Sequence, residues 1–190
     1  RHGVHNIHIS SGCIYNGYDK EYNECDEPNF GLKEEYSSWY SKTKHAGELK
    51  LYGTNSHIFR IRMPFCSTTS ERNILMKLLK YDNIINQMNS LTNIEDLAEF
   101  TSKFISPEGP LFDSGGGVYN VVNPSPMSTA MIVNILKHNG INNPKWKYIE
   151  LDELLANHTK TGRSNCVLSS DYIKSLGFEL PNTEHSLVRC

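Results

Sequence analysis

Short apolar segments alternate with amphipathic ones along most of this chain, as strands alternate with helices in α/β proteins. Residues 4–9 and 57–63 are rich in Val, Ile and Phe, and each predicts a buried strand. Ser37 or Ser38 precedes residues 39–52, whose pattern predicts a capped helix that stops at Gly53. Further strands are predicted at 84–85 and 118–122, and further helices at 72–79, 94–104 and 129–138.

Polar residues indicate where several of these elements begin and end. Thr92 and Ser128 are the expected N-caps of the last two helices. Residues 16–30 are mostly polar and contain the turn signal Glu27-Pro28-Asn29, which predicts a loop over the surface. Gly115-Gly116-Gly117 precedes a predicted strand and indicates a flexible loop.

The alternation predicts an α/β fold with a Rossmann-like parallel sheet and helical crossovers. A complete dinucleotide-binding fold carries a Gly-x-Gly-x-x-Gly turn after an early strand, and this sequence has none. We therefore expect the N-terminal part of the fold to be absent and the chain to begin within the domain.

Composition and charge exclude several classes of protein. The 190 residues are 38% hydrophobic and 21% charged, as in an ordinary globular domain, and no apolar run is long enough to span a membrane. The net charge of −2 and the scattered Lys and Arg argue against nucleic acid. The five cysteines show no metal-binding spacing, which predicts free thiols, no metal site and, with no secretory signal, a cytoplasmic location.

Candidate chemistry lies in two segments. Tyr40 and Lys44 are at positions i and i+4 of the predicted helix and share one face. An adjacent ammonium would lower the pKa of a phenol from near 10 and suit it for proton transfer, although the spacing also occurs by chance on surface helices. Ser11 and Cys13 follow a predicted buried strand, where open α/β sheets place their ligands.

In combination, several short segments resemble the extended short-chain dehydrogenase/reductases. Within that family they are most similar to the UDP-4-keto-6-deoxyglucose 3,5-epimerase/4-reductases of UDP-rhamnose synthesis. The segments are Ser11-Gly12-Cys13-Ile14-Tyr15, Glu27-Pro28-Asn29-Phe30, Tyr40-Ser41-Lys42-Thr43-Lys44, Arg60-Ile61-Arg62-Met63-Pro64, Arg72-Asn73, Asn89-Ser90-Leu91-Thr92 and Gly162-Arg163-Ser164-Asn165. The last departs at Gly162 from the family's Pro-Arg-Ser-Asn.

The resemblance implies a role for each catalytic candidate. Ser11 would hold the 4-keto oxygen of the sugar, Tyr40 would protonate the nascent alkoxide, and Lys44 would tune Tyr40 and bind the nicotinamide ribose. Cys13 and Lys77 would be the acid-base groups of epimerisation, because a thiol ionises close to neutrality. Cys13 could instead be a small buried hydrophobe, and Lys77 a solvated helix residue.

The resemblance also implies binding residues. Ser11, Tyr40, Lys44 and the segment Arg62-Met63-Pro64 would contact the cofactor, NADPH or alternatively NADH. For a UDP-linked 4-keto-6-deoxy sugar, Arg163 would lie near the diphosphate, a role its guanidinium suits. Asn73, Asn89 and Asn165 would bind sugar or base. A surface salt bridge for Arg163 and solvated loop positions for the asparagines are the alternatives, and His45 is expected on the surface.

By the same resemblance, residues 1–66 would form the later half of an NAD(P)-binding domain with the catalytic residues. Residues 67–190 would form a small C-terminal substrate-binding lobe, interleaved with a returning strand and helix near 117–139. Three functions remain open: a bifunctional 3,5-epimerase and 4-reductase, a 4-reductase alone, and a non-catalytic regulatory subunit of the same fold. A homodimer is compatible with each.

Overall fold

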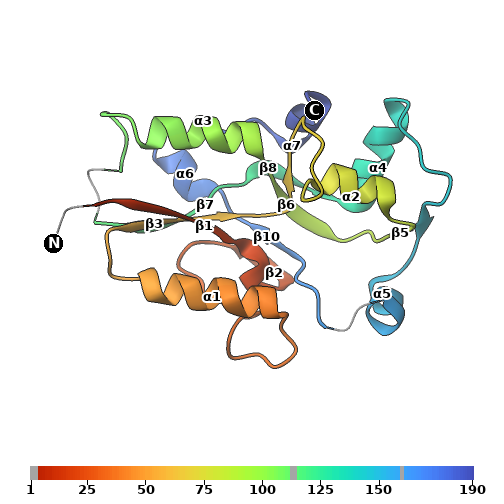
Figure 1. The fold of residues 1–190 in the computed structure, drawn as a ribbon, viewed down its shortest axis with the longest axis horizontal. Helices are drawn as coiled ribbons and strands as arrows, with labels where there is room; N and C mark the ends of the chain where they lie inside the picture. The colour runs from red at the N-terminus through yellow and green to blue at the C-terminus, as the bar shows by residue number, and fades with distance from the viewer. Residues whose placement is uncertain (1–3, 112–114, 159–160) are drawn as a thin grey trace.

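The computed structural model describes residues 4–111, 115–158 and 161–190 and has the predicted α/β architecture (Figure 1). A parallel sheet of β1 (Asn6–Ser11), β3 (Ser56–Ile61) and β7 (Gly117–Asn120) lies at one end. Phe59 of β3 is opposite both Ile9 of β1 and Tyr119 of β7. Parallel neighbours need long crossover connections, and the intervening segments supply them.

Helices cover both faces of this sheet. Helix α1 (Trp39–Leu51) joins β1 to β3 and lies on one face, while α3 (Ile94–Phe104) lies on the other (Figure 1). Under α3, the Phe59 ring packs edge-on against Phe100 and Phe104, with centroids 5.2 and 5.0 Å apart. The α3 face is therefore an aromatic core, whereas the α1 face contains the buried polar residue Glu48.

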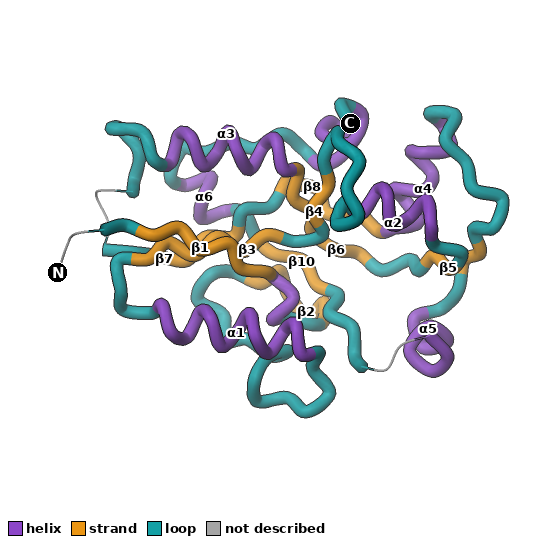
Figure 2. Tube along the Cα trace, in the orientation of Figure 1, coloured by secondary structure: helices purple, strands orange, loops and turns teal. Residues whose placement is uncertain are grey.

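A second group of short strands lies next to the sheet of β1, β3 and β7 (Figure 2). Strand β4 (Pro64–Phe65) runs parallel to β6 (Met88–Asn93), which pairs antiparallel with β8 (Asn123–Ser128). Helices α2 (Ile74–Lys80) and α4 (Thr129–His138) pack on these strands and share an apolar cluster with them. The cluster is centred on Phe65, Leu78, Leu91, Ile132 and Val133.

The remaining elements are short. They are η1 (Gly12–Ile14), β2 (Gly17–Tyr22), β5 (Asn83–Ile84), β9 (Lys147–Tyr148), α5 (Leu151–His158), β10 (Cys166–Leu168), α6 (Asp171–Ser175) and α7 (Thr183–Val188). Strand β2 pairs with β10, and β5 with β9, both in parallel. Every helix in the described part of the chain is too short or too polar to cross a bilayer.

The helix caps show where local sequence signals hold. Ser38 caps α1 and Ser128 caps α4, each hydroxyl accepting a backbone N–H three residues on. The prediction for α3 was wrong by one residue, because Asn93 accepts from Asp96 N and caps this helix. Thr92 lies inside β6 instead, where its hydroxyl donates to the Val121 carbonyl.

Two further expectations from the sequence are wrong. The predicted surface loop at 16–30 contains β2, which pairs with β10 about 150 residues away. His45 is buried, not on the surface, and its Nδ1 accepts a hydrogen bond from Leu32 N at 3.2 Å. Strand β7 does return to pair with β3, while α4 packs beside α2. The division at residue 66 stays a prediction.

Candidate active site

Ser11 and Cys13 lie together where β1 ends. Ser11 is 3% exposed, and its hydroxyl accepts a hydrogen bond from Cys13 N at 3.2 Å, which caps η1. A side chain on the intervening Gly12 would come within 2.6 Å of Leu168, so this turn is packed tightly against β10. The turn fixes Cys13 beside the end of the strand, as the sequence predicts for a site-forming loop.

Helix α1 brings Tyr40 and Lys44 to the same place. Lys44 Nζ donates to the Ile9 carbonyl at 3.0 Å and lies 5.8 Å from the centroid of the Tyr40 ring. The Tyr40 hydroxyl lies close enough to Ser11 for that side chain to lower its pKa, although Tyr40 as a whole is 53% exposed. The structure therefore gathers Ser11, Cys13, Tyr40 and Lys44 at one end of β1.

The electrostatics of Tyr40 differ from the expectation. Burial raises the pKa of Tyr40, and Cys13 adds to this effect. The Ser11 side chain and the Arg62 cation oppose this effect and lower the pKa of Tyr40. The lowering expected from Lys44 is therefore not the net direction here, and Tyr40 is held as a neutral phenol that can donate a proton.

Arg62 lies directly behind Cys13, with its guanidinium in the protein interior. The residue is 2% exposed. Its Nη1 donates to Cys13 Sγ at 3.4 Å and to Ser164 Oγ at 3.0 Å. Its Nε and Nη2 donate to Asn89 Oδ1, and Nη2 also donates to the Ser164 carbonyl at 2.6 Å. The guanidinium donors are therefore used within the protein, and the predicted contact of Arg62 with the cofactor stays a prediction.

Asn89 and Asn165 belong to the same buried network. Asn89 Nδ2 donates to Asn165 Oδ1 at 3.1 Å, and Asn89 Oδ1 also accepts from Cys166 N at 3.2 Å. Together with Asn73, both are at most 4% exposed, so the solvated alternative is wrong for all three. Asn89 and Asn165 connect β6 and β10 to Arg62, a structural role that leaves their predicted contacts with the sugar untested.

Met63 and Arg163 line a separate cavity of about 450 Å³ between α2, β5 and α5. Arg163 is exposed, and Lys80, Tyr81 and Asp82 complete one wall. Met63 has φ of 39°, in the left-handed region that residues with a Cβ seldom adopt. The next residue, Pro64, opens β4. Two segments predicted to meet the cofactor and the diphosphate thus border one hollow.

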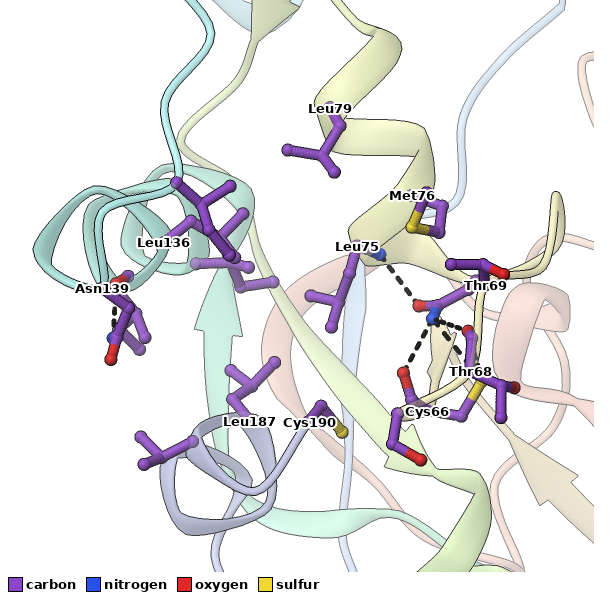
Figure 3. A pocket seen from close by; sticks show the side chains of 16 residues that line it. Cys66, Thr68, Thr69, Leu75, Met76, Leu79, Leu136, Asn139, Leu187 and Cys190 are labelled. Carbon is purple, nitrogen blue, oxygen red and sulfur yellow. Dashed lines mark hydrogen bonds between the residues drawn. The ribbon is translucent and has the colours of Figure 1, made fainter.

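Lys77 and Asn73 lie on α2, outside this group. No hydrogen bond among the described residues joins Lys77 to Cys13, and its predicted role stays a prediction. Asn73 caps α2 beside an apolar cavity of about 300 Å³ (Figure 3). Its Nδ2 donates to the carbonyls of Cys66 and Thr68 at 2.8 and 3.0 Å, so the turn uses both amide hydrogens.

A buried ion pair that the sequence did not reveal supports the site from behind. Glu48 and Arg60 are 0% and 1% exposed, and Arg60 Nη2 lies 2.8 Å from Glu48 Oε2. Ser10 Oγ donates to Glu48 Oε1 at 2.5 Å. Because Glu48 lies one turn after Lys44 and Ser10 directly precedes Ser11, this cluster ties α1 to both strands that carry the site.

All five cysteines are free thiols. Among residues 4–111, 115–158 and 161–190, no group of three His, Cys, Asp or Glu side chains is arranged to hold a metal ion.

The chain is similar in sequence and in structure to several enzymes of rhamnose synthesis. No protein-family model matches the chain. A bifunctional dTDP-4-dehydrorhamnose 3,5-epimerase/dTDP-4-dehydrorhamnose reductase of Arabidopsis thaliana is 29% identical over 194 residues, covering 96% of this chain and 60% of that protein. An uncharacterized protein of Acanthamoeba polyphaga mimivirus is 25% identical over 190 residues, covering 96% and 62%.

Solved structures agree on the fold. The UDP-rhamnose synthase of Acanthamoeba polyphaga mimivirus superposes with a TM-score of 0.83 at 24% identity, covering 98% of this chain and 65% of that one. The dTDP-4-dehydrorhamnose reductase of Bacillus anthracis, solved with NADP, gives 0.77 at 19% identity with the same coverage. The chain thus spans less than two thirds of each relative. These matches confirm the Rossmann-like fold and the resemblance to nucleotide-sugar epimerases and reductases.

Proposed function

We propose that this chain carries the catalytic and sugar-binding part of a 3,5-epimerase and 4-reductase that converts UDP-4-keto-6-deoxy-D-glucose to UDP-L-rhamnose. The observation that carries the proposal is the meeting of Ser11, Cys13, Tyr40 and Lys44 at one end of β1. The similarity to named epimerase/reductases supports the choice of substrate class.

For reduction, the ketone oxygen binds between Ser11 and Tyr40, whose side chains interact with each other at the end of β1. Hydride would come from a bound reduced nicotinamide, NADPH or NADH. As negative charge develops on the oxygen, the neutral Tyr40 phenol donates its proton and Ser11 donates a hydrogen bond. Arg62 lies near enough to stabilise the resulting phenolate.

The site's donors fit a nicotinamide ribose. Lys44 uses one N–H for the Ile9 carbonyl, and an ammonium has three donors, so two remain for ribose hydroxyls. Tyr40 is half exposed beside it and can offer the same face. The residues that bind the adenosine end of the cofactor determine the choice between NADPH and NADH.

For epimerisation, Cys13 removes a carbon-bound proton next to the ketone. The S–H bond forms as the C–H bond breaks, and the electron pair moves to the ketone oxygen as an enolate. Ser11 and Tyr40 hold that oxygen as well. A second acid, for which Lys77 is the candidate, returns a proton to the opposite face of the carbon, and Cys13 releases its own proton to water.

Product analysis tests this proposal. The protein is incubated with UDP-4-keto-6-deoxyglucose and NADPH in deuterated water, with cofactor oxidation followed optically and the product identified by NMR. We expect UDP-L-rhamnose labelled at carbons 3 and 5. Product without label would indicate a 4-reductase alone. The absence of both turnover and label would favour a non-catalytic subunit.

Two substitutions separate the half-reactions. Tyr40→Phe should slow cofactor oxidation by roughly 10²–10⁴-fold and slow deuterium uptake much less, because Ser11 still holds the enolate oxygen. Tyr36→Phe, four residues earlier in the turn before α1 and 59% exposed, is its control and should change neither. Cys13→Ala should abolish deuterium uptake and spare reduction of a substrate already epimerised. Uptake that persists in Cys13→Ala would refute the role of this thiol.

A further inference from the structure

Arg62 is a buried cation without a carboxylate partner in the described part of the chain. Its partners are the Asn89 amide, the Ser164 hydroxyl and carbonyl, and the Cys13 thiol. By contrast, Arg60, two residues earlier, pairs with Glu48. Burying a charge without a counter-charge costs several kcal/mol, so the environment of Arg62 calls for a nearby group that can become negative.

Among the residues that the structure describes, four ionisable groups interact with the Arg62 guanidinium from the surrounding elements. They are Cys13 of η1, Tyr18 of β2, Tyr40 of α1 and Cys166 of β10. Burial raises the pKa of Tyr18, of Tyr40 and of Cys166, which keeps all three neutral. Cys166 also points its thiol at the Gly12 carbonyl, 3.5 Å away.

Cys13 differs from these three by contact and by exposure. Its sulfur is 3.4 Å from Arg62 Nη1, within the range of a hydrogen bond to sulfur. It is only half-buried, whereas Cys166 is buried. The other partners of Arg62 are neutral oxygens, which leaves this sulfur as the one contacting atom that can carry a negative charge.

We propose that Arg62 holds Cys13 as a thiolate, through a charge-assisted N–H···S⁻ hydrogen bond, and so acts as a positioning residue for the epimerisation step. The role in epimerisation rests on the proposed function, whereas the test of the thiolate needs neither substrate nor cofactor. A thiolate is the form that can accept a carbon-bound proton. The thiolate also disfavours ionisation of Tyr40, so one ion pair sets a base and an acid side by side.

Alkylation kinetics test the protonation state directly, without substrate or cofactor. The protein is treated with limiting iodoacetamide from about pH 6 to about pH 10, the range in which free thiols titrate. Mass spectrometry then gives the labelling rates of Cys13 and of the exposed Cys25 in the same molecule. We expect Cys13 to retain its reactivity at low pH where Cys25 loses it, and both to follow one profile in urea.

Substitutions identify the source of the effect. Arg62→Met should slow alkylation of Cys13 near neutral pH about tenfold, equivalent to one unit on the pH axis, and leave Cys25 unchanged. Arg62→Lys keeps the charge and should retain part of the reactivity. Ser164→Ala removes a neutral partner of the same guanidinium and should change the Cys13 rate less than twofold, which separates charge from packing.

Two results would overturn the proposal. One is an identical pH profile for Cys13 and Cys25 in the unmodified protein, a result that requires no variant to fold. The other is unchanged Cys13 reactivity in Arg62→Met with a native circular dichroism spectrum. A reactive Cys13 in a protein that turns over no keto sugar would refute the proposed function and leave the thiolate standing.

Discussion

Arg60 and Arg62 are two residues apart and are both buried, yet their surroundings differ completely. Arg60 meets a carboxylate through three donor contacts and two tyrosine hydroxyls besides. Arg62 meets one amide, the hydroxyl and carbonyl of a serine, and a thiol. The first charge is neutralised within the fold, while neutralisation of the second depends on a group that can react.

The difference separates two uses of a buried cation. A pair such as Arg60 and Glu48 fixes the relative position of α1 and β3 and takes no part in chemistry. A cation with neutral partners keeps its field available for charges that appear and disappear during a reaction. Substitutions on the two sides should therefore fail in different ways.

The largest expected effect is on the Arg60 side. Arg60→Met leaves the Glu48 carboxylate buried without a partner, which should lower the free energy of unfolding by about 3–5 kcal/mol. Urea unfolding followed by circular dichroism measures this loss. The exposed Arg72→Met is the control and should stay within about 0.5 kcal/mol of the unmodified protein. A loss below about 1 kcal/mol for Arg60→Met would mean that the Arg60–Glu48 pair does not hold α1 against β3.

Arg62→Met should be less destabilising. It leaves no carboxylate unpaired, but the Ser164 carbonyl loses its donor and Asn89 Oδ1 keeps only Cys166 N, at a cost of about 1–3 kcal/mol. The same urea titration applies. A loss equal to that of Arg60→Met would erase the contrast and make Arg62 a structural ion.

Ser10→Ala tests the hydrogen bond that Ser10 donates to the Glu48–Arg60 pair. The substitution removes one hydrogen bond to Glu48 but leaves the carboxylate paired with Arg60, so we expect a loss of about 1 kcal/mol. The catalytic residues are untouched, yet the ends of β1 and α1 should separate slightly. Cofactor oxidation should fall by less than the effect of Tyr40→Phe, and an unchanged stability would show that Ser10 donates elsewhere in solution.

The smallest expected effect is a slope with pH. Burial lowers the pKa of His45, whose Nδ1 accepts from Leu32 and must be unprotonated to do so. The unfolded chain therefore binds more protons than the folded one below about pH 6.5, and stability should fall as the pH drops through that value. His45→Gln should flatten the slope of unfolding free energy against pH. The control His185→Gln, at an exposed position, should leave the slope of unfolding free energy against pH unchanged.

Much of this fold could be predicted from local signals. Ser38 and Gly53 bracket α1, and Ser128 opens α4, because a cap needs only its own neighbours. Strand β2 could not be found in this way. Its residues from Tyr18 to Glu21 are exposed and polar, and they form a strand only because β10, far along the chain, pairs with it.

The candidate site divides in the same manner. Ser11 and Cys13 follow one strand and Tyr40 and Lys44 share one helix face, so short-range spacing brought each pair to attention. Arg62 depends on Ser164, 102 residues later, and on Asn89 for its neutral surroundings. No local pattern distinguishes it from Arg60, since the two arginines differ only in what the tertiary structure places against them.

The buried cluster of Ser10, Glu48 and Arg60 also determines whether helix α1 could be transferred to another protein. Residues 39–51 present Tyr40 and Lys44 outward, but the same helix is fastened inward through a carboxylate that requires an arginine on one strand and a serine on another. A graft of the helix alone into a new scaffold would bring a buried negative charge without its partners. The transferable unit is therefore β1, α1 and β3 together, since they share one internal salt bridge.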